Sequence, residues 1–124
     1  MERSLLSTDS LEQRMLAQQA EISRLTAEQL LDLEELDYRQ VATADGCRSL
    51  SEWTTARLDI HPDTAKTLVR TMRRTAERPD LRQALAGGEI SFDRMEALSR
   101  IREDVGRLEH LDVAGVRREA ANRI

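Results

Sequence analysis

The 124-residue chain is poor in the residues that interrupt or cross-link a fold. It contains one tryptophan, one tyrosine and one phenylalanine, so Leu, Ile, Val, Met and Ala must supply most of its core. Only two prolines and five glycines occur, which favours long helices over the frequent turns of an all-β fold. No alternating strand pattern competes, and the length suits one domain. The sequence therefore predicts an all-α protein.

Metal-binding, disulfide-forming and membrane-spanning patterns are also missing. The single cysteine, Cys47, cannot form an internal disulfide, which argues against a secreted, cross-linked scaffold. The two histidines, His61 and His110, lie far apart, so no metal site and no cofactor are expected. No apolar run approaches the ~20 residues of a membrane span, and residues 1–10 lack the pattern of a signal peptide. We expect a cytoplasmic protein with no membrane partner.

A long N-terminal helix is the first predicted element. Residues 1–9 are expected to be a flexible lead, and residues 10–124 a single all-helical domain with a long helix over 10–45. Ser10 is the predicted N-cap and Gly46 the stop, with no Gly or Pro between them. Thr26 could begin a second helix, but no helix breaker lies near it, so one helix is preferred.

Residues 46–124 are predicted to form a compact bundle of about five shorter helices. Serine caps, two prolines at helix starts and a Gly-Gly stop divide this part of the chain. The expected helices cover residues 50–58, 63–77, 79–86, 91–101 and 112–124.

Charge is distributed unevenly along the chain. The formal net charge is −4, and 18 of the 19 basic residues are arginines. Residues 1–45 carry a net −6, whereas residues 62–82 carry six basic and three acidic side chains. The net acidity therefore does not exclude a polyanionic partner.

The basic block has the geometry of a two-faced helix. Its apolar residues recur at helical spacing and predict a buried face: Ala65, Leu68, Val69, Met72 and Ala76. Its cations form a second stripe, Lys66, Arg70, Arg73, Arg74 and Arg78. Thr64, Thr67, Thr71 and Thr75 are expected to add surface hydroxyls. Such a stripe suits phosphate oxygens, so the five cations with Thr67 and Thr71 are the predicted DNA-binding site.

The preceding segment strengthens this interpretation. A short helix ending at Leu58, a turn over residues 59–62 and then the basic helix follow the order of a helix-turn-helix motif. Trp53 could serve as a base-stacking platform, but a core anchor between helices is the preferred interpretation.

Several separated motifs resemble the actinobacterial 13E12 repeat family, also called domain of unknown function 222. The resemblance extends from about residue 11 to the chain end. The motifs are Gly46-Cys47-Arg48-Ser49 with Trp53, the helix Thr64–Arg74, Pro79, Gly88-Glu89-Ile90-Ser91 and Leu111–Arg118. One departure is His61, where the family usually has a small hydroxyl residue at the helix cap.

The resemblance implies a DNA-associated helical module of actinobacteria and their phages, often followed by an HNH endonuclease domain. The histidine base and metal ligands of that nuclease are absent from this sequence. Either the nuclease lies elsewhere in a longer protein or the chain is a short relative. No catalytic residues are therefore predicted, and no small-molecule substrate is evident.

Two functions remain open from the sequence. The first is a DNA-binding module that positions a nuclease or a regulatory partner on duplex DNA and is not itself an enzyme. The alternative is a protein–protein interaction or dimerisation module that self-associates through residues 11–44, because a helix of that length exceeds the width of a small domain.

Overall fold

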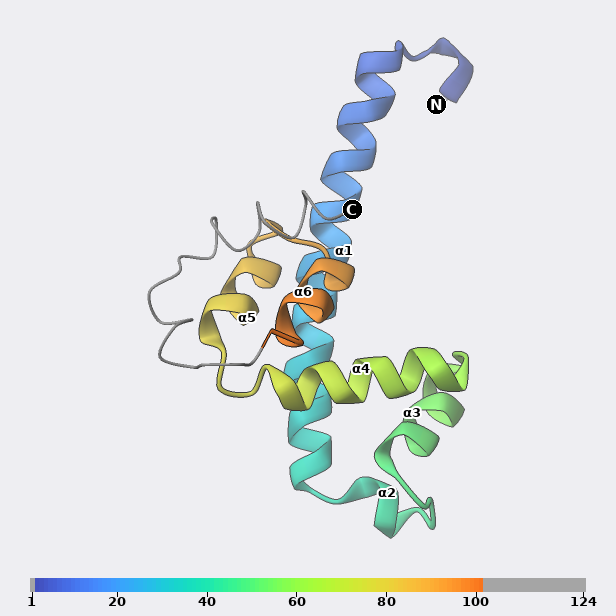
Figure 1. Cartoon of the computed structure of the whole chain (residues 1–124). Helices are drawn as coiled ribbons and strands as arrows, with labels where there is room; N and C mark the ends of the chain where they lie inside the picture. The colour runs from blue at the N-terminus through green and yellow to red at the C-terminus, as the bar shows by residue number, and fades with distance from the viewer. Residues whose placement is uncertain (1, 102–124) are drawn as a thin grey trace.

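The computed structural model describes residues 2–101, and over this range the chain is entirely helical and loop. After a short 3-10 turn at Arg3–Leu5, the helices are α1 Thr8–Tyr38, α2 Val41–Ala44, α3 Leu50–Leu58, α4 Pro62–Arg74, α5 Pro79–Ala86 and α6 Phe92–Ser99. The long helix α1 runs the length of the molecule, and α4 crosses it (Figure 1). The all-α class with a long first helix is confirmed. The helix predicted over 112–124 lies outside the described residues.

Helix α1 begins earlier than the sequence predicted. Ser7 is its N-cap, and the Ser7 hydroxyl accepts a hydrogen bond from the Ser10 backbone N–H at 3.1 Å. Leu6 and Leu11 hold the two positions of a hydrophobic staple, and both are partly buried. The predicted cap at Ser10 and the boundary of the lead at residue 9 are therefore wrong, because Ser7 caps the helix three residues upstream.

The end of α1 also differs from the prediction. The helix stops at Tyr38, and Gln40 adopts a left-handed conformation with φ 56° before α2 starts. This turn redirects the chain so that Ala42 reaches the core. The helix is continuous through Thr26, whose hydroxyl donates to the Ile22 carbonyl at 2.8 Å, so a single helix at that point is confirmed. The prediction that this helix continues to residue 45 is wrong, because α1 ends at Tyr38 and α2 is a separate helix.

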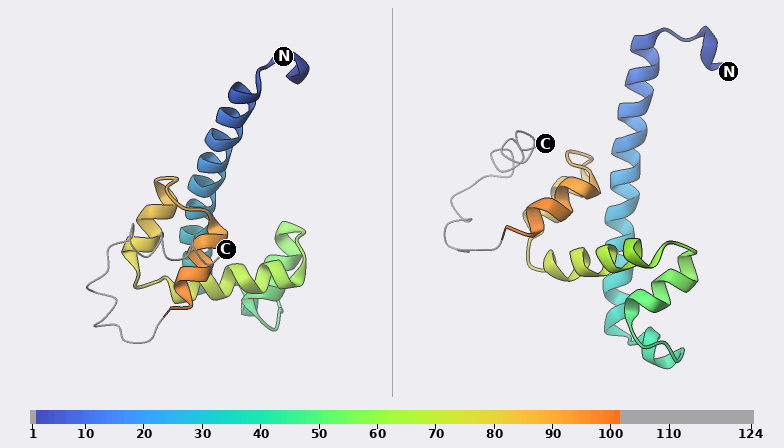
Figure 2. Two further views of the ribbon diagram at one scale, coloured as in Figure 1. Left: turned by 45° about the horizontal axis from the view of Figure 1, so that its top comes forward. Right: turned by 45° about the vertical axis from the view of Figure 1, so that its right-hand side comes forward.

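The core lies where α1, α4, α5 and α6 meet. Leucine and methionine fill it, as the scarcity of aromatic residues required, and its most deeply buried apolar side chains are Leu30, Met72, Leu81, Leu85, Met95 and Leu98. All buried residues of α1 belong to its C-terminal part: Ser23, Ala27, Leu30 and Leu33. The N-terminal half of α1 therefore extends beyond the bundle, as the two views in Figure 2 show.

A largely buried arginine joins three of these helices. The Arg82 guanidinium of α5 pairs with Glu34 of α1 at 3.1 Å. It also donates to the Thr75 hydroxyl and to the Met72 carbonyl, both at 2.8 Å. The Arg82 side chain is only 14% exposed. The bonds of Nε and Nη2 compensate in part for the hydration that the guanidinium loses on burial. The C-terminal end of α4 is thereby fixed to α1 and α5.

Gly88 provides a direct test of the packing between α1 and the bundle. Its φ is +74°, and a Cβ at this position would lie 2.9 Å from the Ala20 Cβ on α1. Gly88→Ala should therefore lower the free energy of unfolding by about 2–3 kcal/mol, through backbone strain and steric overlap.

Gly46→Ala is the matched control in a urea denaturation series. Gly46 has φ +79°, but nothing lies within 4 Å of its added Cβ, so only the strain of about 1 kcal/mol is expected. Equal losses of stability in the two variants would contradict the close approach of Gly88 to α1.

Candidate nucleic-acid interface

Helices α3 and α4 form a packed pair joined by a short, well-capped turn. The Ser49 hydroxyl caps α3 by accepting from the Glu52 N–H at 3.1 Å. Asp59 then takes a left-handed conformation with φ 55°. The His61 Nδ1 caps α4 by accepting from the Asp63 N–H at 3.0 Å. Pro62 occupies the first turn of α4, where its missing N–H is not needed. The predicted order of short helix, turn and basic helix is present.

Helix α4 has a buried face and an exposed basic face. The buried side chains include Ala65, Val69 and Met72, as predicted, while Leu68 is only partly buried. Ala76 is exposed, which corrects its predicted place on the buried face, because the helix ends at Arg74. The cations Lys66, Arg70, Arg73 and Arg74 are all exposed.

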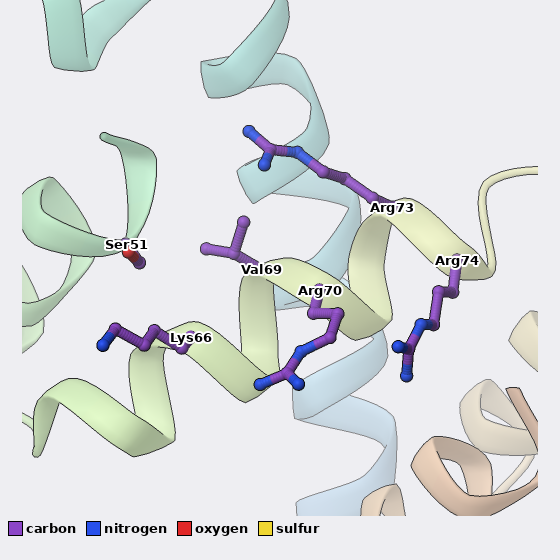
Figure 3. A pocket seen from close by; sticks show the side chains of 6 residues that line it. All are labelled: Ser51, Lys66, Val69, Arg70, Arg73 and Arg74. Carbon is purple, nitrogen blue, oxygen red and sulfur yellow. The ribbon is translucent and has the colours of Figure 1, made fainter. Parts of the chain in front are cut away.

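Three of these cations have no ion-pair partner in the described part of the chain. Lys66, Arg70 and Arg74 follow one another at intervals of four residues, and none forms an ion pair within residues 2–101. With Arg73, Val69 and Ser51 of α3, they line a shallow hollow of about 300 Å³ between α3 and α4 (Figure 3). We call Lys66, Arg70 and Arg74 the basic stripe.

Arg73 lies beside the basic stripe but is oriented differently. Its side chain extends toward the C-terminal part of α1 in Figure 3, and its Nη2 lies 3.3 Å from Asp37 Oδ1. Both side chains remain substantially exposed, at 56% and 36%. An exposed ion pair of this kind contributes little free energy, so Arg73 can exchange Asp37 for another anion at small cost.

Arg78 is not brought together with the other four cations. It lies beyond the end of α4 as the N-cap residue of α5, and its guanidinium forms two hydrogen bonds with Asp80, at 3.1 and 2.9 Å. Burial raises the pKa of Asp80, but these bonds and the charge of Arg78 outweigh it and hold that pKa below its ordinary value. Arg78 therefore stabilises the start of α5.

The two predicted threonines differ in their placement. Thr67 is partly buried at the edge of α4. Thr71 is 1% exposed and Thr75 is 0% exposed, so the predicted place of both on the exposed surface is wrong. Helix α4 packs against α1, α3 and α6, and the buried face is therefore wider than the apolar spacing alone indicates. Within residues 2–101 the Thr71 Oγ1 has no hydrogen-bond partner.

Replacing Thr71 by valine tests this correction. A buried hydroxyl without a partner destabilises the fold, so Thr71→Val should raise the free energy of unfolding by about 1 kcal/mol. Affinity for duplex DNA should not change. If Thr71→Val lost affinity for duplex DNA and its free energy of unfolding did not change, Thr71 would be part of the DNA interface and this correction would be wrong. Thermal unfolding and fluorescence polarisation are the two measurements.

Trp53 anchors α3 and is not free to stack on a base. Its Nε1 donates to Asp45 at 2.8 Å, Arg57 pairs with the same carboxylate at 2.8 Å, and the Arg57 guanidinium lies 5.4 Å from the Trp53 ring centre. The hydrogen bond from Trp53, together with Arg57, lowers the pKa of Asp45. The indole packs against the core, as the preferred interpretation of this residue predicted.

Sequence reasoning missed two contributions to this region. Ser51 lines the hollow from α3, and only the three-dimensional pairing of α3 with α4 reveals it. Arg82 was counted among the six basic residues of 62–82. Its side chain is largely buried and bonds to Glu34 and to the Met72 carbonyl, which gives it a structural role.

The described part of the chain contains neither a cluster of metal-ligating side chains nor a helix suited to span a membrane. Among residues 2–101, no group of three or more His, Cys, Asp and Glu side chains could hold a metal ion. In the same range, no helix combines the length and the apolar character needed to cross a bilayer.

No family model, curated protein or solved structure matches the chain. The resemblance to the 13E12 repeat family therefore stays a prediction that depends on the motifs quoted above.

Proposed function

We propose that this protein is a DNA-binding helical module that contacts duplex DNA through the exposed face of α4. The observation that carries the proposal is the basic stripe. Lys66, Arg70 and Arg74 are exposed, share one side of a helix and lack ion-pair partners within residues 2–101. A fold that leaves adjacent cations unpaired incurs mutual repulsion, which a polyanion would relieve.

The dimensions of α4 fit a nucleic-acid duplex. At 1.5 Å rise per residue, the stripe covers about 12 Å along the helix axis, and the major groove of B-DNA is about 12 Å wide. Long cationic side chains on one side of a helix can reach the phosphates of one strand while the helix lies in or across the groove. Arg73 would join them after releasing Asp37.

In this proposal the chain supplies binding, and a nuclease or regulatory partner acts on the DNA that it holds. The absence of a catalytic set in the sequence and the family resemblance both support this division of roles. A module with this function would work in the cytoplasm, where it meets DNA.

A direct binding assay tests the proposal. A fluorescein-labelled duplex titrated with the protein at ~50 mM salt should show saturable binding by polarisation. Arg70→Glu with Arg74→Glu should weaken it by roughly 100-fold or more, since two phosphate contacts are replaced by repulsion.

The matched control is Arg3→Glu with Arg100→Glu. Both residues are exposed and lie outside α4, and the double variant has the same change in net charge. Its affinity should stay within about threefold of the wild type, because distant surface charges act weakly through salt. No binding by the wild-type protein, or equal losses in the two double variants, would contradict an interface on α4.

A further inference from the structure

Helix α1 carries a seam of mostly apolar residues that begins in the part extending beyond the bundle and continues alongside it. Met15 is 70% exposed, Ile22 54% and Leu25 50%. Leu11 precedes these three residues in the same stripe. Gln18 lies between Met15 and Ile22, and Gln29 follows Leu25. These six residues are separated by alternating steps of four and three. We call them the α1 seam.

This spacing is that of a coiled coil. Steps of four and three give the 3.5-residue repeat that keeps one stripe facing a partner helix, with Met15 and Ile22 at a positions and Leu11 and Leu25 at d positions. The next d position is Asp32, whose carboxylate would face its own copy and so ends the seam. The core of the bundle uses a different side of α1, through Ser23, Ala27 and Leu30.

We propose that the α1 seam joins two copies of this chain in a parallel, in-register coiled coil. In this arrangement each seam residue meets its own counterpart. Gln18 faces Gln18 of the second copy and Gln29 faces Gln29, so the amides can hydrogen-bond across the interface between apolar layers. In an antiparallel pair, Gln18 would face Ile22, and an amide would lose its partner.

The flanking charges are compatible with the parallel arrangement. The g-to-e′ pairs are Arg14 with Gln19 and Glu21 with Thr26, and neither places like charges together. An antiparallel pair would bring Glu21 close to Glu21 but also Arg14 close to Glu28, so the glutamine layers and not the flanking charges distinguish the two directions. In the structure Glu21 is already neutralised on its own helix by Arg24, with Nη2 2.6 Å from Oε1.

Within residues 2–101, the bundle covers a different side of α1 from the seam. The buried residues of α1 lie to one side of the seam. The two-fold axis of a parallel dimer therefore places the two bundles on opposite sides of the coiled coil. The packing of α1 on the bundle already holds its C-terminal part helical, which lowers the cost of ordering so short a coiled coil. The dimer would present two α4 helices, but it does not require that α4 bind DNA.

Sedimentation equilibrium on the full chain, from about 1 µM to 1 mM, tests the proposal. The wild-type protein should convert from monomer to dimer, and Ile22→Glu should raise the dissociation constant by roughly 100-fold, because one charge per copy replaces an apolar layer. Leu31→Glu is the matched control: Leu31 is also 54% exposed but lies off the seam, so its dimer should persist. A monomer throughout, or a dimer that both variants weaken equally, would overturn the proposal.

Cysteine cross-linking determines the direction of the helices. In a Cys47→Ser background, Gln18→Cys should form an intermolecular disulfide under mild oxidation, since the two position-18 side chains meet only in the parallel register. Leu31→Cys should not. A disulfide that forms only when the Gln18→Cys and Ile22→Cys variants are mixed would indicate antiparallel helices. That result would overturn the parallel arrangement.

Discussion

The buried guanidinium of Arg82 is the interaction on which the placement of α4 depends. It bonds to Glu34 of α1 and to the Thr75 hydroxyl and the Met72 carbonyl at the end of α4. The three bonds join helices that are far apart in sequence. Removing the guanidinium would leave a half-exposed carboxylate and a carbonyl without their partner. With the C-terminal end of α4 fixed against α1, the opposite side of the helix is free to face solvent.

Ion pairing divides the basic block into two groups of side chains. Arg82 and Arg78 are held by Glu34 and Asp80 and stabilise the fold. The basic stripe and the weakly held Arg73 remain available to an external anion. The formal net charge of −4 therefore describes an average over a molecule whose charges are separated in space. Proximity and pairing, not the total, determine which partner the surface suits.

The sequence predicted the helices whose ends are marked by local chemistry. The cap at Ser49, the proline start of α4 and the Gly87-Gly88 stop could all be found because capping depends on a few neighbouring residues. The break between α1 and α2 at Gln40 could not be found from the sequence. Gln40 is a non-glycine residue in the left-handed conformation, and no capping residue in the sequence marks that turn. Tertiary packing, not local chemistry, caused a further miss: the burial of Thr71 follows from a wider buried face on α4.

The apolar residues of α1 show the same limit. The fold separates residues that face the bundle, such as Leu30, from residues that face solvent, such as Ile22, and sequence spacing alone does not make this distinction. Residues 2–101 thus present a cationic outward surface on α4 and an apolar one on α1. Their chemistry is different enough that each can be tested without the other.

The salt dependence of duplex binding tests the central claim most directly. Each phosphate neutralised contributes about −0.9 to the slope of log K against log salt. Three contacts from the basic stripe predict a slope of about −2.7, and about −3.6 if Arg73 joins. Arg70→Gln with Arg74→Gln should make the slope shallower by about 1.8. A slope that these substitutions leave unchanged would place the contacts elsewhere and contradict the assignment to α4.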